Sequence, residues 1–374
     1  MQGSRDSAAI YGLVLALCGV GMILSASAAP PKSGQQQPAL PDRETVGEMA
    51  KNAKTVGDYT ELVDTLTPPV SGSELLPKDD YFREMLGWAL NRRGEVYLKH
   101  ATLAQEEGNA AESQRLDRLA IADFELAVRA DPAKWKALHN RGTFYAVHGR
   151  LQEALRDFDR VVSLNPDYAN AWFNRAELRF DLGQYEPAIR DYSEALLRDD
   201  TLHSALQKRG LSKFKLGKVR SALADFENGL EADDSNAELY VDRGECHRAL
   251  GNWERAAADF RRAIELQPDL SRAYQRVAWL MATCPEPRFR DAEMAIRAAR
   301  QTLELGGADD YQSRDVLAAA LANDGQYELA VEELQRAIGA APRDARPLLD
   351  QRLELYQSNR PYRQRVEAVA GKKK

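Results

Sequence analysis

Residues 135–270 decide the fold, because they contain four successive copies of one 34-residue unit. The first two copies read WKALHNRGTFYAVHGRLQEALRDFDRVVSLNPDY (135–168) and ANAWFNRAELRFDLGQYEPAIRDYSEALLRDDTL (169–202), and two more follow at 203–236 and 237–270. Five residue types recur at the same offsets: Arg141, Arg175, Arg209 and Arg243; Gly149, Gly183, Gly217 and Gly251; Ala154, Ala188, Ala222 and Ala256; Asp157, Asp191, Asp225 and Asp259; Phe158, Tyr192, Phe226 and Phe260. A period of this length is typical of stacked-repeat proteins, in which each unit contacts mainly its neighbours.

Each copy is predicted to form two helices joined by a tight turn at the recurring glycine. In the first copy we expect helices over 135–148 and 151–163, with Asn165-Pro166 ending the second one. The recurring Ala and the aromatic residue four positions later share one face of the second helix. The small side chain would let helices approach, and the ring would fill the space between neighbouring units. We therefore predict an all-α fold.

The unit resembles the tetratricopeptide repeat (TPR), a helical hairpin with small and aromatic residues at set positions. In the first copy the matching residues are Leu138, Gly142, Tyr145, Ala154, Phe158, Val161 and Pro166. The chain departs from the family pattern where Arg141 and its equivalents replace a Leu, and where Arg179, Lys213 and His247 replace a Tyr. The resemblance covers about residues 81–342, and segment 280–296 (LMATCPEPRFRDAEMAI) is similar to exported bacterial members. It implies a right-handed superhelical solenoid of about seven repeats with a C-terminal capping helix.

The chain outside the regular copies is divided by its composition and helical spacing. Residues 44–66 predict one or two short helices broken near Gly57-Asp58, and the last helix, at 345–358, has Leu348 and Leu349 on its apolar side and charges on the other. The predicted parts are a signal peptide (1–28), a disordered linker (29–43), short helices and a loop (44–80), a first repeat with a long hairpin (81–134), regular repeats (135–168, 169–202, 203–236, 237–270), an irregular sixth repeat (271–307), a seventh (308–342), and the capping helix with a basic tail (343–374).

The N-terminus has the pattern of an export signal. Arg5 precedes an apolar stretch at 10–24, and Ala26-Ser27-Ala28 forms a cleavage site. The stretch is shorter than the roughly 20 residues of a membrane-spanning helix. We expect a periplasmic or secreted protein, and the alternative is an uncleaved segment 10–24 that anchors it in the inner membrane. In the exported protein, Cys246 and Cys284 would be either two buried thiols or a disulfide, which their spacing does not decide.

Composition and motifs argue against several classes of function. The net charge of −6 and the pI of about 5.6 do not indicate a nucleic-acid-binding face. The sequence has no phosphate-binding glycine loop, HExxH, GxSxG or CxxC motif. Its five histidines are scattered, with none three or four residues from another. We expect no catalytic residues, no metal and no cofactor, and therefore no enzyme.

The recurring Arg and Asp lie 16 residues apart, one on each helix of a unit. We interpret them as structural ion pairs that join the two helices, each contributing about 0–1 kcal/mol if exposed. An arginine could instead bind a ligand carboxylate, but repetition in every unit favours the structural role. The predicted pairs are Arg141 with Asp157, Arg175 with Asp191, Arg209 with Asp225, and Arg243 with Asp259.

The resemblance also implies a concave groove, lined by the first helices, that binds a protein or peptide. The family's groove positions correspond here to His139, Asn140, Phe173, Asn174, Glu177, Phe180, Gln207, Lys208, Phe214, Lys215 and Asp242. Asn140 and Asn174 match a position that holds a peptide backbone or carboxylate in some members. The Lys and Asn partners of that carboxylate clamp are missing, which argues against an acidic peptide C-terminus. The three phenylalanines would either contact a peptide or pack against the adjacent helix.

These observations predict a non-enzymatic scaffold or adaptor that works outside the cytoplasm. Its groove, centred on repeats two to five, would hold a peptide or helix of an unidentified protein partner. One alternative is a membrane-anchored assembly factor of the cell envelope, whose linker gives it reach. Another is self-association through an imperfectly capped end of the array. The identity of the partner is left open.

Overall fold

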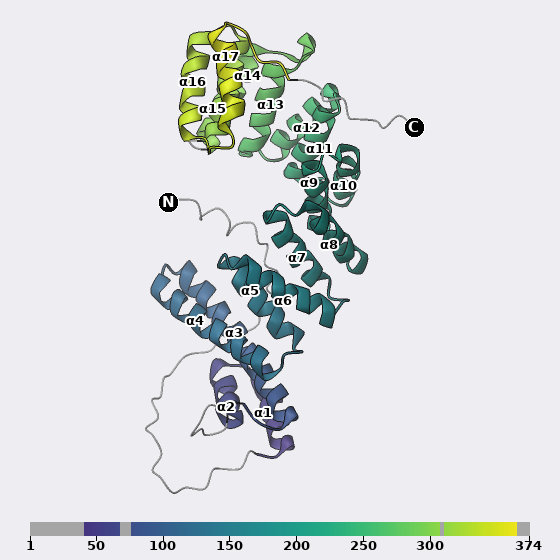
Figure 1. The fold of residues 1–374 in the computed structure, drawn as a ribbon, viewed down its shortest axis with the longest axis vertical. Helices are drawn as coiled ribbons and strands as arrows, with labels where there is room; N and C mark the ends of the chain where they lie inside the picture. The colour runs from purple at the N-terminus through teal and green to yellow at the C-terminus, as the bar shows by residue number, and fades with distance from the viewer. Residues whose placement is uncertain (1–40, 68–75, 307–309, 365–374) are drawn as a thin grey trace. The chain divides into compact units, whose positions relative to one another are not determined.

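The computed structural model describes residues 41–67, 76–306 and 310–364, and these residues form α-helices joined by turns, with no strand among them (Figure 1). The predicted all-α fold is confirmed. The chain divides into two compact units, Met1–Leu182 (unit 1) and Gly183–Lys374 (unit 2), so that the boundary falls inside the third repeat. The predicted export signal lies outside the described residues. Within those residues, every helix is too short or too polar to cross a membrane.

Unit 1 consists of two short helices followed by longer hairpins. The hairpin of α3 and α4 has helices of 27 and 21 residues, as expected for a lengthened first repeat, and α2 packs on α3. The helices are α1 (Arg43–Asn52), α2 (Val56–Leu66), α3 (Asp80–Glu106), α4 (Ala110–Ala130), α5 (Trp135–Val147), α6 (Leu151–Leu164) and α7 (Ala169–Asp181).

The break between α1 and α2 lies at residues 53–55, so the predicted break near Gly57-Asp58 is wrong. Thr55 is the N-cap of α2, and its side chain accepts a hydrogen bond from the Asp58 backbone N–H. The Asp58 carboxylate in turn accepts from the Thr55 backbone N–H at 2.8 Å. This reciprocal capping box starts a helix. Gly57 therefore lies in the first turn of α2, where a glycine does not break the helix.

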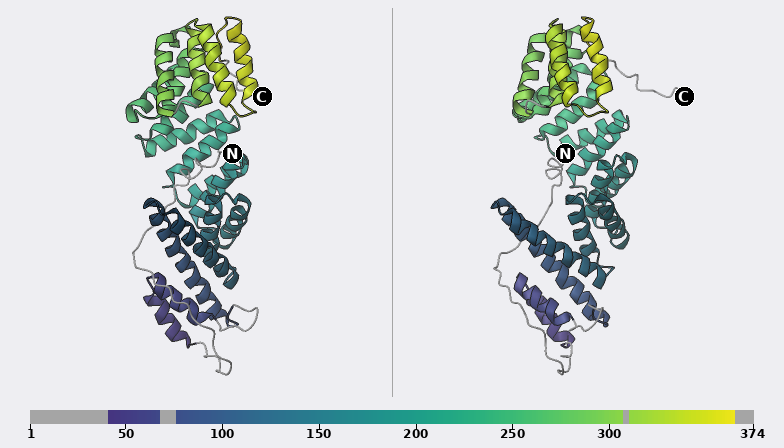
Figure 2. Two further views of the ribbon diagram at one scale, coloured as in Figure 1. Left: turned by 90° about the vertical axis from the view of Figure 1, so that its left-hand side faces the viewer. Right: turned by 60° about the vertical axis from the view of Figure 1, so that its left-hand side comes forward.

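Unit 2 consists mainly of helical hairpins and ends in a single helix, and its members stack side by side in all three views (Figures 1 and 2). The first helices of its hairpins, α9, α11, α13 and α15, contact one another in sequence. The helices are α8 (Tyr185–Arg198), α9 (His203–Lys215), α10 (Val219–Ala232), α11 (Ala237–Ala249), α12 (Trp253–Leu266), α13 (Ser271–Thr283), the 3-10 turn η2 (Pro287–Phe289), α14 (Ala292–Gly306), α15 (Tyr311–Asn323), α16 (Tyr327–Ala340) and α17 (Arg346–Gln357).

The hairpins pack as the Ala and aromatic positions predict. In the fifth repeat Ala256 and Phe260 are fully buried. Gly244 of α11 lies directly on the Phe260 ring, because a Cβ at this position would come within 2.5 Å of Phe260 Cε1. The turn of this hairpin passes through Gly251 at a φ of 76°, a conformation that only glycine adopts readily. The recurring glycines therefore serve both the turn and the helix contact.

The last helix, α17, caps the array with a different face from the one predicted. Leu349 is 3% exposed, but Leu348 is 51% exposed and Arg352 is buried. Arg352 forms an ion pair with Asp315 of α15, and its guanidinium carbon lies 4.7 Å from the Trp279 ring centroid. The prediction that charges face outward was wrong at this residue, because α15 supplies a buried carboxylate. Cys246 and Cys284 are both buried free thiols.

Candidate functional site: the first-helix surfaces

The candidate site is the surface that the first helices of successive hairpins form. We call it the first-helix surface of unit 1 where it is formed by α3, α5 and α7. We call it the first-helix surface of unit 2 where it is formed by α9, α11, α13 and α15. Each helix contributes one or two side chains per turn to this surface, so residues from separate repeats lie next to one another.

The recurring Arg and Asp join the two helices of a hairpin beneath this surface. Arg243 and Asp259 form two parallel hydrogen bonds. Arg243 Nη2 lies 2.7 Å from Asp259 Oδ1, and Arg243 Nε lies 3.0 Å from Asp259 Oδ2. The same bidentate geometry joins Arg93 to Asp123, Arg141 to Asp157 and Arg209 to Asp225.

The aspartates of these pairs are buried, so the value of about 0–1 kcal/mol for an exposed pair does not apply to them. Burial raises the pKa of Asp123, and the adjacent Arg93 acts against that rise. Removing the arginine of such a pair leaves an uncompensated buried charge, which costs far more than losing an exposed pair. In the third repeat, Arg175 Nη1 contacts Asp159 Oδ1 at 2.8 Å, and Asp191 is buried on α8.

The first-helix surface of unit 1 contains a cluster of neutral amides around one carboxylate. Asn140 Nδ2 of α5 donates to Asn91 Oδ1 at 2.9 Å and to Glu95 Oε1 at 2.8 Å, and both acceptors belong to α3. Asn91 Nδ2 also donates to Glu95 Oε1 at 2.8 Å. Both amide hydrogens of Asn140 are therefore used within the protein, and only its oxygen is left to meet a ligand.

His139, the neighbour of Asn140, packs as a neutral ring. Its ring centroid lies 5.6 Å from that of Phe158 and 5.1 Å from that of Tyr168, edge to face. Burial lowers the pKa of His139 to about 4. The predicted groove residues of α7 are placed as follows: Phe173, Asn174 and Phe180 are half-buried, and Glu177 is buried.

The first-helix surface of unit 2 carries charges that bridge three repeats. Gln207 of α9 donates to Asp242 Oδ2 of α11 at 2.8 Å. Arg272 of α13 pairs with the other Asp242 oxygen and, at 2.6 Å, with Glu238. Burial raises the pKa of Asp242, while Arg272 acts to lower it. Arg272 was not predicted as a surface residue, because it belongs to the irregular sixth repeat.

A second charged cluster lies one to two turns further along α11 and α13. Glu245 contacts Arg248 at 3.0 Å and Arg276 at 3.3 Å. Burial alone would raise the pKa of Glu245, but Arg276 and Arg248 hold it below its ordinary value. Glu245 fixes the Nε and Nη2 atoms of Arg248, which leaves Nη1 of this guanidinium for another partner.

That partner is the chain's own C-terminal segment, residues 362–364. Arg248 Nη1 donates to Gln364 Oε1 at 2.9 Å, and the Gln364 backbone N–H donates to the Thr283 carbonyl at 3.0 Å. Gln364 is 5% exposed. In Figure 1 the segment after α17 runs back across α13 and α14. This contact was not predicted from the sequence, because residues 343–374 were expected to form only a capping helix and a basic tail.

The other two residues of the segment lie on α13 and α15. Arg363 donates from Nη1 to the Ala282 carbonyl and from Nη2 to Asn323 Oδ1, both at 2.9 Å. The Tyr362 ring centroid lies 5.8 Å from that of Trp279. The segment therefore touches the first helices of three repeats.

Three further predicted groove residues belong to α9. Phe214 packs against the core cluster that contains Phe226 and Cys246. Lys208 is half-buried and Lys215 is exposed. The neighbouring Lys213, which replaces the family's tyrosine, lies 2.7 Å from Asp225 and joins its ion pair. For Phe214 the structure favours the packing interpretation.

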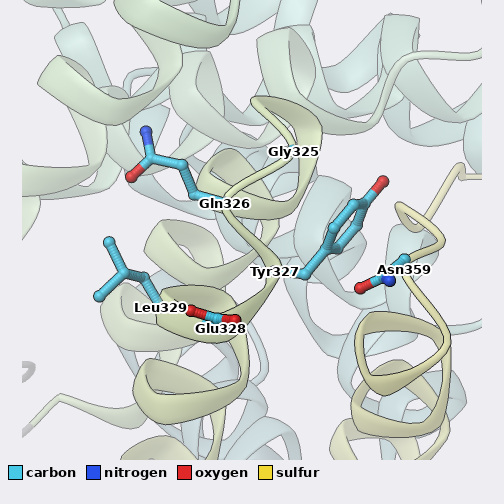
Figure 3. A pocket seen from close by; sticks show the side chains of 6 residues that line it. All are labelled: Gly325, Gln326, Tyr327, Glu328, Leu329 and Asn359. Atoms are coloured by element: carbon cyan, nitrogen blue, oxygen red, sulfur yellow. The ribbon is translucent and has the colours of Figure 1, made fainter.

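A separate surface depression of about 430 Å³ lies beside the turn between α15 and α16. Figure 3 shows the residues that line it: Gly325, Gln326, Tyr327, Glu328, Leu329 and Asn359. Glu328 is the one carboxylate among these lining residues. Across the ranges that the structure describes, no group of His, Cys, Asp and Glu side chains is placed to hold a metal ion.

Comparison with known proteins agrees with this geometry. Residues 140–202 and 208–271 match the tetratricopeptide repeat family. A comparison with curated proteins found no match. A tetratricopeptide repeat protein from Parabacteroides merdae is 20% identical and matches with a TM-score of 0.53, over 71% of this chain and 98% of its own.

Two other solved structures are similar over a smaller share of the chain. PilF of Pseudomonas aeruginosa is 15% identical, with a TM-score of 0.46 over 57% of this chain and 91% of its own. YrrB, described as a TPR protein with an unusual peptide-binding site, is 21% identical, with a TM-score of 0.41 over 47% of this chain and 88% of its own. The helical hairpins within residues 140–202 and 208–271 are therefore tetratricopeptide repeats, a fold generally used by non-enzymatic scaffolds.

Proposed function

We propose that this protein is a scaffold whose first-helix surface of unit 2 binds an extended peptide segment of a partner protein. The observation that carries this proposal is the position of residues 362–364 on that surface. There a backbone N–H, a side-chain amide, a guanidinium and an aromatic ring of a non-helical segment contact α11, α13 and α15. These are the contacts through which a groove holds a peptide.

The proposed site differs from the groove predicted from the sequence. That groove was centred on repeats two to five, and several of its residues are engaged within the protein. Asn140 is bound by Asn91 and Glu95, while Asp242 is bound by Gln207 and Arg272. The surface of repeats five to seven, by contrast, has helix-end carbonyls and Arg248 directed at a peptide-like segment. We therefore place the partner there.

We propose that binding takes place outside the cytoplasm, on the basis of the signal-like residues 1–28. The alternative is a membrane-anchored assembly factor held by residues 10–24. Fractionation of the source cells distinguishes the two: a chain shortened by residues 1–28 in the soluble envelope fraction supports export, and the full chain in the membrane fraction, released only by detergent, supports the anchor.

The binding proposal is tested by selecting peptides from a random dodecapeptide library on the full-length protein. The selection is run on the wild type and on the variant Tyr362→Ala/Arg363→Ala/Gln364→Ala, in which the side chains that hold the segment on the first-helix surface are removed. Selected peptides are then measured by fluorescence anisotropy against Arg248→Glu, which reverses the charge of the α11 residue that contacts Gln364. The matched control is Arg255→Glu, an exposed residue of α12.

We expect peptides whose affinity falls at least tenfold with Arg248→Glu and stays unchanged with Arg255→Glu. Circular dichroism must show that both variants keep the helical content of the wild type. The proposal is wrong if neither selection enriches a peptide. It is also wrong if the two charge reversals weaken binding equally, because binding would then not depend on the first-helix surface.

A further inference from the structure

We propose that residues 362–364 are an intramolecular ligand of the unit 2 first-helix surface, and that this surface takes partner segments with an aromatic, a basic and an amide residue in succession. This inference rests on the proposed function and deepens it by naming the occupant. The chain's own sequence at these positions, Tyr-Arg-Gln, supplies the pattern. The segment would have to leave before a partner binds.

The segment reaches further than capping of the array requires. Helix α17 already covers the last hairpin, with Leu349 and Tyr356 buried against it. The chain nevertheless continues onto two earlier repeats, where Gln364 contacts Thr283 of α13 and Arg248 of α11. Those repeats are packed through their own hairpins, so contact with them is not needed to close the end of the stack.

Contacts within the first-helix surface of unit 2 orient the groups that bind the segment. Glu245 orients Arg248 so that one guanidinium nitrogen is left for Gln364. The carbonyls of Ala282 and Thr283 lie at the end of α13, where carbonyl groups lack a partner within the helix. They accept from Arg363 and from the Gln364 backbone, respectively. The site therefore offers an orientated cation and two helix-end acceptors to a passing peptide.

The first residue of the segment, the aromatic Tyr362, is contacted by Arg352 of α17. Arg352, fixed by its ion pair with Asp315, has its guanidinium carbon 4.7 Å from the Trp279 ring centroid and 5.0 Å from that of Tyr362. A cation placed over two rings favours an aromatic residue at this position of the bound segment. Trp279 forms the other wall, so the position selects a flat side chain.

The contacts of Arg363 make the segment displaceable. Its guanidinium is bound by two backbone carbonyls and one side-chain amide oxygen, and no carboxylate contacts it among the described residues. Burial and the nearby Arg290 lower the pKa of Arg363. A tethered segment needs only weak contacts, since tethering gives it an effective concentration on the order of millimolar. A partner that binds at micromolar concentration would displace it.

The test uses the full-length protein and a fluorescent peptide with the sequence of residues 358–367, SNRPYRQRVE. Anisotropy is measured with the wild type and with Tyr362→Ala/Arg363→Ala/Gln364→Ala, and a scrambled peptide serves as control. We expect the variant to bind the peptide at least tenfold more tightly than the wild type. Adding Arg248→Ala to the variant is expected to weaken binding at least tenfold, whereas adding Arg255→Ala leaves it unchanged.

Equal binding by wild type and variant, or equal binding of the scrambled peptide, would overturn the inference. If the triple variant loses helical content, the single substitution Gln364→Ala takes its place. We then expect the affinity for the peptide to rise at least threefold, and an unchanged affinity would overturn the inference. Exchange of the Gln364 amide hydrogen, followed by mass spectrometry, gives a second measurement. Protection is expected at all protein concentrations. Protection that is lost as a dimer dissociates would assign the segment to a second copy and overturn the intramolecular proposal.

These outcomes separate the inference from the proposed function. Peptides that depend on Arg248 and bind the wild type and the variant Tyr362→Ala/Arg363→Ala/Gln364→Ala equally would support the function and overturn the intramolecular ligand. Library peptides that bind neither protein would overturn the function, whatever the behaviour of residues 362–364.

Discussion

The two first-helix surfaces are built on the same repeat but carry different chemistry. In unit 1, Asn91, Asn140 and Glu95 form a small amide cluster between α3 and α5. In unit 2, Gln207, Asp242 and Arg272 link α9, α11 and α13. Residues 362–364 cover the neighbouring cluster that contains Arg248. The buried Arg–Asp pairs beneath are alike in both units. The difference teaches that the hairpin contacts follow the repeat, whereas the surface positions vary independently of it.

The largest expected effect on stability is in unit 2, at the ion pair between Arg352 of α17 and Asp315 of α15. Arg352→Met would leave Asp315 buried without its counter-charge, which costs about 3–5 kcal/mol of unfolding free energy. Urea unfolding followed by circular dichroism measures this as an earlier transition of unit 2. Arg336→Met, which breaks exposed pairs on α16, is the control and should cost about 0–1 kcal/mol. Equal effects of the two substitutions would contradict the buried pair.

The helix contacts are expected to be tighter in the fifth repeat than in the second. Gly244→Ala would bring a Cβ within 2.5 Å of Phe260, and overpacking of this kind costs about 1–3 kcal/mol. At Gly142 the nearest atom to a Cβ is Asp157 Cβ at 3.2 Å, so Gly142→Ala should cost less. Thermal unfolding of both variants compares them. A larger loss for Gly142→Ala would show that the ring of Phe260 moves freely.

Unit 1 is expected to lose stability in mild acid because of His139. Its pKa is about 4 in the folded protein, against about 6.5 in an unfolded chain. Between these values the unfolded state binds more protons, so the free energy of unfolding falls as the pH is lowered from 7 to 5, by about 1–2 kcal/mol. Urea unfolding at both pH values measures it. His139→Gln should remove this part of the pH dependence, and His203→Gln, at an exposed position, should leave it unchanged.

The smallest effect is expected at the amide cluster of unit 1. Asn140→Ala removes two hydrogen bonds to α3 and should cost about 1 kcal/mol. The same variant should bind the selected peptides with the same affinity as the wild type. A tenfold loss of peptide binding would place the site on the surface of unit 1 and reverse the comparison.

Much of the fold was predictable from the sequence because its signals are local. The 34-residue period, the glycine turns and the Ala and aromatic positions all reflect contacts within a hairpin or between adjacent ones. The break between α1 and α2 lies at residues 53–55 because Thr55 and Asp58 cap α2, and a glycine in the first turn of a helix does not end it. The groove positions were predicted by the resemblance alone, which names positions but does not say which of them are already engaged.

The sequence by itself determined the repeat, its helices and the helix-joining Arg and Asp, because each of these depends on residues within one period. The tertiary structure decided which surface side chains meet. Asp242 and Arg272 are 30 residues apart, Asp315 and Arg352 are 37 apart, and Arg248 and Gln364 are 116 apart. Such contacts depend on how repeats stack and where the chain returns after α17, and neither follows from the periodicity of one hairpin.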